Sequence, residues 1–260
     1  MPFVYLKNVR IFYEDEGEGL PLIFLHPPGM GHAVFHKQKE LTRFFRVLLI
    51  DMRGHGKSSS GNDELSISLL ADDLENFMDA LHIDRAVIIG YSSGGSIAQE
   101  FAIHHQHRVA ALVLCGGFPE VNDPFLNLEF KAGISLAYNL KALSWIIAKS
   151  HAKTEAEFRI LRSYFQLTDP EVLKQFYVKG RLYSCVEQLS NLHIPLLHLT
   201  GEFAFYFHHY QTMYEKAVPS VRTVRVSNTF HEIPTKSFRE FNHAVLAFLT
   251  SIKAYSHPVV

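Results

Sequence analysis

The chain has 260 residues, 47% of them apolar, and its 25 basic residues nearly balance 26 acidic ones. This length suits one large α/β domain, and a balanced charge without a basic run argues against nucleic acid and anionic membrane surfaces as partners. Two cysteines, Cys115 and Cys185, are too few for a disulfide framework. The sequence does not begin with a basic segment followed by a long apolar stretch, and it has no run of eighteen apolar residues. We therefore expect a cytoplasmic protein with no membrane insertion. A small-molecule substrate and a monomer or homodimer fit this composition.

Sixteen histidines raise the question of a metal site, above all at His104-His105 and His208-His209. Adjacent histidines on a helix point to different faces, and no nearby cysteine or carboxylate completes a tetrahedral set. We therefore expect solvated histidines at helix ends, no metal site and no cofactor.

The first 81 residues alternate strand and helix signals. Residues 3–15 read as an antiparallel hairpin around a turn at Lys7-Asn8. The continuous apolar runs 22–25 and 45–50 are typical of strands buried on both faces of a mainly parallel sheet, and residues 67–81 have helical spacing. The charged loop 51–58 is expected to fold on itself, with Asp51 pairing locally with Arg53.

The apolar run 86–89 stops at the pentapeptide Gly90-Tyr91-Ser92-Ser93-Gly94, and a helical pattern follows over residues 95–105. The pentapeptide fits G-x-S-x-G, in which small residues let a strained turn pack between a strand and a helix. Such a turn exposes the serine hydroxyl and aims the first N–H groups of the helix at a nascent oxyanion. Ser92 is therefore the candidate nucleophile.

The strand signal returns at 109–115, disappears from 118 to about 189, and resumes at 194–201 and 221–226. Residues 125–148 and 154–178 have helical spacing, broken at Thr168-Asp169-Pro170, which predicts an all-helical insertion. Its aromatic residues, including Trp145, suggest an apolar pocket wall, although plain packing between helices explains most of them. A final helix is expected over about 235–252, and the tail from Ala254 is expected to fray.

Several motifs occur in a fixed order: the loop His26-x-x-Gly29-x-Gly31, the loop Asp51-x-Arg53-Gly54-His55-Gly56-x-Ser58, the pentapeptide, the helical insertion, Gly201-Glu202 and a late His231. This ordered set resembles the α/β-hydrolase superfamily, in its branch of capped single-domain esterases and C–C hydrolases. The resemblance implies an α/β fold with a mostly parallel eight-stranded sheet flanked by helices. It also implies a core domain formed by residues 1–117 and 190–260, and a helical cap formed by residues 118–189.

The resemblance implies acyl transfer on a small apolar ester, lactone or related carbonyl compound. Ser92 would attack the carbonyl, and His231 would take its proton and return it to the leaving group. The residues expected to bind substrate or oxyanion are Ser93, Pro28, Gly29, His26, Tyr91 and Trp145.

Two positions depart from the family pattern. Where the family has the acid after Gly-Glu-x, this chain has Ala204, so another carboxylate would have to orient His231. Glu120 is the slightly favoured replacement, with Glu202 and Asp123 as alternatives; otherwise the enzyme is weak or inactive, or Ala204 was introduced on purpose.

The second departure is Pro28, which has no N–H where the family donates one to the oxyanion. Either Gly29 donates instead, or the N–H of Ser93 works with less help.

Two rival functions stay open on the same scaffold. A ligand-binding or signalling protein with slow or no turnover is consistent with both departures. A cofactor-free haloperoxidase, dehalogenase or lyase shares the fold, although Ser92 disfavours dehalogenases that use a carboxylate at the turn.

Overall fold

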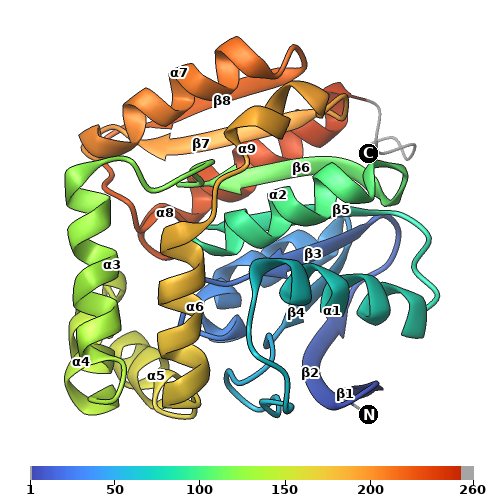
Figure 1. Cartoon of the computed structure of the whole chain (residues 1–260). Coiled ribbons are helices and arrows are strands. Elements are labelled where there is room, and N and C mark those ends of the chain that lie inside the picture. Colours follow the sequence, from blue (N-terminus) through green and yellow to red (C-terminus); the bar gives the residue numbers. More distant parts are fainter. Residues whose placement is uncertain (1, 253–260) are drawn as a thin grey trace.

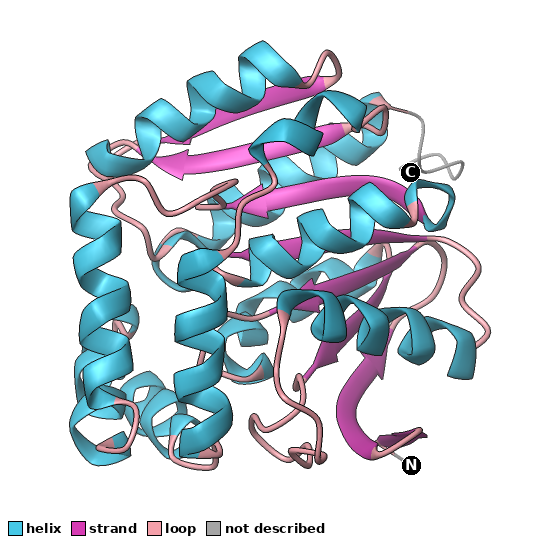
Figure 2. Ribbon diagram, in the orientation of Figure 1, coloured by secondary structure: helices cyan, strands magenta, loops and turns pink. Residues whose placement is uncertain are grey.

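A single sheet forms the centre of the molecule in the computed structural model, which describes residues 2–252 (Figures 1 and 2). Its eight strands lie in the order β1-β2-β4-β3-β5-β6-β7-β8. Only the β1/β2 and β2/β4 pairs are antiparallel, and the other five pairs are parallel. The strands are β1 Phe3–Leu6, β2 Val9–Glu16, β3 Pro21–Leu25, β4 Arg46–Ile50, β5 Ala86–Tyr91, β6 Val109–Cys115, β7 Leu196–Gly201 and β8 Val221–Val226. The predicted fold class is confirmed.

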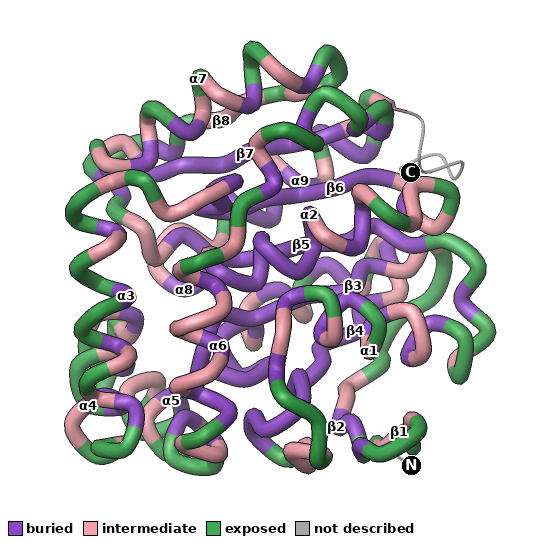
Figure 3. Tube along the Cα trace, viewed as in Figure 1, coloured by how far each residue is buried: buried purple, intermediate pink, exposed green. Residues whose placement is uncertain are grey.

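The continuous apolar runs are explained by two hydrophobic cores, one on each face of the sheet. In β5, Ile88 packs into one core, while Val87 and Ile89 pack into the other. Successive side chains of a strand point to opposite faces, so a strand covered on both sides has no polar position. Every residue of β5 is buried, as Figure 3 shows for the centre of the molecule.

Helices cover both faces. Helices α1 (Ile67–Ala80), α2 (Gly94–His104) and α7 (His208–Ala217) contribute to the first core, and α1 and α2 cover the face toward the viewer in Figure 1. The 3-10 segment η1 (His32–Arg43) and helices α8 (Ile233–Lys236) and α9 (Phe238–Ser251) contribute to the second. Shorter 3-10 turns are η2 Gln106–Arg108, η3 Val186–Asn191 and η4 Phe205–Phe207.

Four helices lie between β6 and β7, and Figure 1 shows them grouped beside one end of the sheet: α3 Pro124–Leu136, α4 Leu140–His151, α5 Glu155–Phe165 and α6 Pro170–Leu182. We refer to residues 118–189 as the helical insertion. Its break at Asp169-Pro170 is confirmed, because the Asp169 side chain caps α6 and proline occupies the first turn. The stretch 125–148 is divided in two, because Asn139 caps a new helix by accepting from the N–H of Ala142.

One local expectation needs correction, and one helix was not predicted. Arg53 pairs with Asp73 of α1, at 2.7 Å from Nη2 to Oδ1, and not with Asp51. Asp51 instead accepts hydrogen bonds from the backbone N–H of His32 and from the hydroxyl of Tyr164. Helix α7 carried no recognised signal.

Near both ends of the described chain, the observed elements largely match the predicted ones. The hairpin is confirmed by the β1/β2 register, which pairs Leu6 with Val9 around the Lys7-Asn8 turn. The last predicted helix is interrupted at Ser237, between α8 and α9. The predicted fraying from Ala254 lies outside the described residues. Within residues 2–252, no helix has both the length and the apolar character needed to cross a bilayer.

Candidate active site

Ser92 sits in a strained turn between β5 and α2. Its φ is 52°, in the left-handed region that side chains other than glycine rarely adopt, and its N–H donates to the carbonyl of Cys115 at 2.9 Å. A Cβ at Gly90 would lie 2.5 Å from the Cα of Gly95, and one at Gly94 would lie 2.1 Å from the carbonyl oxygen of Leu25. The turn therefore requires glycine on both sides of Ser92, as the pentapeptide predicts.

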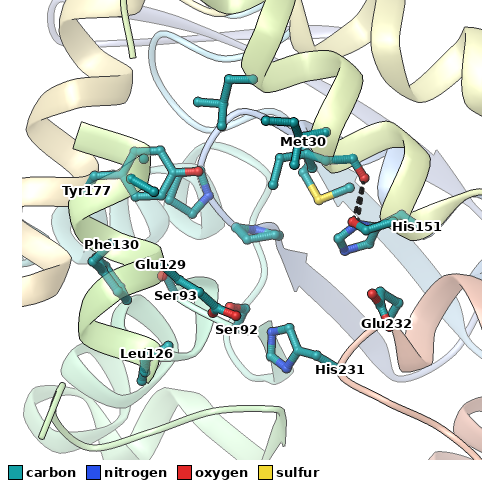
Figure 4. Close-up of a pocket in the computed structure, with 18 of the residues that line it drawn as sticks. Met30, Ser92, Ser93, Leu126, Glu129, Phe130, His151, Tyr177, His231 and Glu232 are labelled. Carbon is teal, nitrogen blue, oxygen red and sulfur yellow. Dashed lines mark hydrogen bonds between the residues drawn. The ribbon is translucent and has the colours of Figure 1, made fainter. Parts of the chain in front are cut away.

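Ser92 opens into a cavity of about 350 Å³ between the sheet and the helical insertion (Figure 4). Helices α3 and α4 supply an apolar wall, and the loop after β3 supplies a second side. The lining residues are Pro27, Pro28, Met30, Tyr91, Ser92, Ser93, Leu126, Glu129, Phe130, Ala132, Gly133, Leu136, Leu143, Ile146, Ile147, Ser150, His151, Tyr177, Tyr206, His231 and Glu232. The predicted nucleophile and base thus line one cavity.

The His231 imidazole is held by packing. Its loop crosses the end of β7 so closely that a Cβ at Gly201 would lie 1.8 Å from the carbonyl oxygen of Phe230. The ring stacks on Phe207, with centroids 4.6 Å apart and planes 7° apart, and its centroid lies 5.2 Å from that of Tyr91. A Cβ at Gly116 would touch the imidazole, at 2.4 Å from Cε1 and 2.6 Å from Nδ1. Aromatic rings and a glycine therefore surround the base.

The Nδ1 atom of His231 is buried and, among the described residues, has no hydrogen-bond partner. Burial, with a smaller contribution from the charge of His151, lowers the pKa of His231 from 6.5 to about 3. In a serine hydrolase a carboxylate at Nδ1 fixes the tautomer and stabilises the imidazolium that forms when serine loses its proton. His231 lacks this support.

The carboxylates considered as replacements are engaged elsewhere. Glu120 accepts from the side chains of Asn122, at 2.7 Å, and Ser184, at 3.3 Å. Glu202 accepts from the backbone N–H of Asn228 at 2.8 Å. Asp123 caps α3 through the backbone N–H groups of residues 125 and 126. The structure brings none of the three to Nδ1 of His231.

Of the residues expected to bind substrate or oxyanion, Ser93, Pro28 and Tyr91 line the cavity, whereas Gly29, His26 and Trp145 do not. Gly29 has φ 83°, and a Cβ added to it would lie 2.2 Å from the ring of Phe165. Trp145 is 52% exposed, on the outer side of α4.

His26 is fully buried and supports the loop after β3. Its Nε2 accepts from the N–H of Met52 at 3.0 Å, so its Nδ1 donates to the carbonyl of Pro27 at 2.9 Å. Burial lowers its pKa to about 3, so the ring stays neutral. His26 therefore organises the loop and does not contact the substrate space.

Sequence reasoning missed the polar residues of the insertion side of the cavity. Glu129 lies on the same face of α3 as Leu126 and Phe130, so helical spacing would have found it. Burial raises the pKa of Glu129, although a hydrogen bond from the Tyr206 hydroxyl, at 3.1 Å, opposes this. His151, the last residue of α4, was another missed position.

The chain matches the family model described as alpha/beta hydrolase fold over residues 21–189. Over 97% of its length it is 26% identical to the putative carbamate hydrolase RutD of Azorhizobium caulinodans, covering 99% of that protein. It is 39% identical to 2-hydroxy-6-oxononadienedioate/2-hydroxy-6-oxononatrienedioate hydrolase of Paraburkholderia xenovorans, over 44% of each chain. That match, like several with other curated relatives, spans less than half of the relative.

Among solved structures, the enol-lactonase from Burkholderia xenovorans superimposes with a TM-score of 0.85. The superposition covers 96% of this chain and 100% of the enol-lactonase, at 22% identity. This likeness agrees with the fold described above.

Proposed function

The chain belongs to the alpha/beta hydrolase fold family, and from this premise we propose that it is a serine hydrolase for small, neutral, largely apolar esters, lactones or related carbonyl compounds. One observation carries the proposal: Ser92, in a strained turn at φ 52°, opens into the same cavity as the His231 imidazole. Backbone strain that the surrounding structure holds in place is typical of functional positions.

In the proposed reaction the Ser92 hydroxyl attacks the substrate carbonyl while His231 takes its proton. The tetrahedral oxyanion is stabilised by the N–H of Ser93, at the start of α2, where the helix dipole also favours negative charge. His231 then protonates the leaving group, and water enters by the same steps in reverse to release the acid. Pro28 lines the cavity without an N–H to offer, so this oxyanion site has fewer donors than usual.

The charges around the cavity favour a neutral substrate. Among the described residues, no lysine or arginine lines it, and its two carboxylates are Glu129 and Glu232. An anionic substrate would lose its hydration without gaining a cationic partner, which is costly in a partly apolar site. The Paraburkholderia relative is named for dioates, and the lining of this cavity favours a different, uncharged substrate.

We further propose that the helical insertion acts as the cap of the site. Helices α3 and α4 contribute about half of the lining residues, from Leu126 to His151. A wall on a separate set of helices can move to admit substrate and exclude water during reaction.

Labelling with a fluorophosphonate tests the proposal. We expect one adduct on Ser92, found by peptide mass spectrometry, and none in Ser92→Ala. In His231→Ala the labelling rate should fall strongly, because the base is lost while the serine stays in place. Folded protein that forms no adduct at Ser92 would refute the proposed function.

The orphaned Nδ1 of His231 favours a second candidate, a protein that binds a small ligand with slow or no turnover. Turnover of p-nitrophenyl acetate separates the two functions. If no short ester is turned over while a carbonyl ligand binds in the cavity, the binding function is the better conclusion.

A further inference from the structure

One hydroxyl joins three segments of the site. The Tyr91 hydroxyl lies 2.8 Å from Nε2 of His151 and 3.3 Å from the backbone carbonyl oxygen of His231. Tyr91 directly precedes Ser92, His151 ends α4 of the insertion, and His231 is the proposed base. Tyr91 is 1% exposed and His151 is 7% exposed. Figure 4 shows His151, Glu232 and His231 on one side of the cavity.

The surroundings of His151 fix its tautomer. Its Nδ1 lies 2.9 Å from the carbonyl oxygen of Ile147, which can only accept, so Nδ1 carries the hydrogen. The Ser150 hydroxyl lies 2.9 Å from both this Nδ1 and the Ile147 carbonyl oxygen. Since an Nδ1 lone pair facing the carbonyl oxygen at 2.9 Å would be repelled, Nδ1 keeps its hydrogen and the hydroxyl donates to the carbonyl. In neutral His151 the Nε2 atom therefore has a lone pair, and the Tyr91 hydroxyl must donate to it.

The phenol has one proton, so it can make only one full bond as a donor. While His151 is neutral, the shorter contact takes that proton, and the His231 carbonyl keeps only its bond from the N–H of Ile233, at 2.9 Å. When His151 gains a proton, its Nε2–H donates to the Tyr91 oxygen. The phenol proton then turns to the second lone pair of the His231 carbonyl.

We propose that Tyr91 is a positioning residue for His231 and that the protonation of His151 decides whether it acts. This inference rests on the proposed function of His231 as the base. With protonated His151, the carbonyl of His231 is held by Ile233 and by Tyr91, so the loop that carries the imidazole is fixed more firmly.

The groups that face His151 determine the pH at which it gains a proton. Burial lowers its pKa below 6.5, the charge of Glu232 raises it, and the charge of Lys236 lowers it; the other neighbours are Tyr91 and His231. Burial also lowers the pKa of His231, to about 3. Because burial lowers the pKa of His151, the step lies on the acid side of pH 6.5. The charge of protonated His151 also lowers the pKa of His231, so it opposes part of the gain that firmer positioning gives.

The test follows the rate of fluorophosphonate labelling at Ser92 from about pH 5.5 to 8, a working range chosen around the ordinary histidine pKa in which the protein is expected to stay folded. In the wild type the rate should step upward on the acid side by roughly three- to tenfold, the worth of one buried hydrogen bond. His151→Phe leaves the phenol free for His231 at every pH, so its rate should stay at the higher level without a step. Tyr91→Phe should stay at the lower level, also without a step.

His151→Leu is the second variant, in case the larger ring does not fit, and thermal melting checks that each variant is folded. Coincident pH profiles for the wild type, His151→Phe and Tyr91→Phe would overturn the inference while leaving the proposed function intact.

A second readout does not depend on activity. In ¹⁵N-histidine NMR spectra, the His231 resonances should follow the titration of His151 in the wild type and should follow it less in Tyr91→Phe, where only the direct effect of the His151 charge remains. If Ser92 is never labelled, the proposed function fails, and this NMR comparison still decides whether Tyr91 links the two histidines. An unchanged response in Tyr91→Phe would overturn the link.

Discussion

Restoring a carboxylate at position 204 is the strongest test of how this site is built. Ala204 is 1% exposed, and its carbonyl accepts from the N–H of Phe207, whose ring stacks on His231. Its backbone, at φ −86° and ψ 60°, is open to any residue. Ala204→Asp would introduce the acid at the position where the family has it, and we expect the new carboxylate to accept from the orphaned Nδ1 of His231.

The expected gain follows from the pKa of His231. A carboxylate that brings this pKa from about 3 back to its ordinary 6.5 strengthens the protonated imidazole by about 5 kcal/mol, at 1.36 kcal/mol for each pKa unit. In a serine protease, loss of the corresponding charge lowers turnover about ten-thousandfold. We expect Ala204→Asp to raise kcat by at least about a hundredfold. Overpacking a buried position should cost about 1 to 3 kcal/mol of stability.

The assay is steady-state hydrolysis of p-nitrophenyl acetate by wild type, Ala204→Asp and Ala204→Asn. Asparagine has nearly the same shape as aspartate without its charge, so it separates electrostatics from volume. We expect the gain only in the aspartate variant, and with it a rise in the pKa of His231. A folded Ala204→Asp with unchanged kcat, or an equal gain in Ala204→Asn, would refute this account of Ala204.

Three further predictions concern stability, packing and specificity. The pKa values of His26, His55, His198 and His231 are lowered to about 3, 4, 4 and 3 by burial, so below pH 6.5 the unfolded chain binds more protons. Stability should therefore fall from pH 6.5 toward 4, by up to about 5 kcal/mol per pH unit; a melting temperature that stays flat over this range would contradict it. Phe207→Leu removes the stack on His231 and should slow Ser92 labelling about two- to tenfold, whereas the control Phe205→Leu, at a 71% exposed ring, should not. Hydrolysis of p-nitrophenyl butyrate should exceed that of an acyl-matched hemiester bearing a terminal carboxylate by about a hundredfold, and Glu129→Gln should narrow the gap; equal rates would refute the assignment of a neutral substrate.

Much of the fold was readable because the strands of this sheet are buried on both faces. A run such as 86–89 has no polar position when alternate side chains enter different cores, so it is recognisable without an alignment. The turn at Ser92 was recognisable for a related reason. Other parts of the backbone approach Gly90 and Gly94 so closely that no side chain fits at either position. The two glycines of the pentapeptide therefore reveal the turn from the sequence alone.

Contacts between residues far apart in the chain could not be predicted from the sequence. The pairing of Arg53 with Asp73 depends on how α1 lies against the loop after β4, whereas the sequence offered the nearer Asp51. Glu120 comes after β6, on the chain's way to the site. Its backbone, however, forms a β-bridge with Ser184, and its carboxylate accepts from the Ser184 hydroxyl. The division of 125–148 was hidden because both halves keep helical spacing and only the Asn139 cap separates them.

The surroundings of His231 bear on which substrates the proposed hydrolase would cleave best. Phe207 lies parallel to the imidazole at 4.6 Å, and an aromatic face can stabilise a desolvated cation by about 2 kcal/mol. The missing carboxylate corresponds to about 5.4 kcal/mol, the equivalent of four powers of ten in rate. Packing therefore leaves a deficit of about 3 kcal/mol in the step that protonates His231. Aryl esters and enol lactones have more electrophilic carbonyls, so attack by Ser92 needs less proton transfer to His231 in its transition state. Such substrates lose least by this deficit, and the rate should depend steeply on leaving-group pKa.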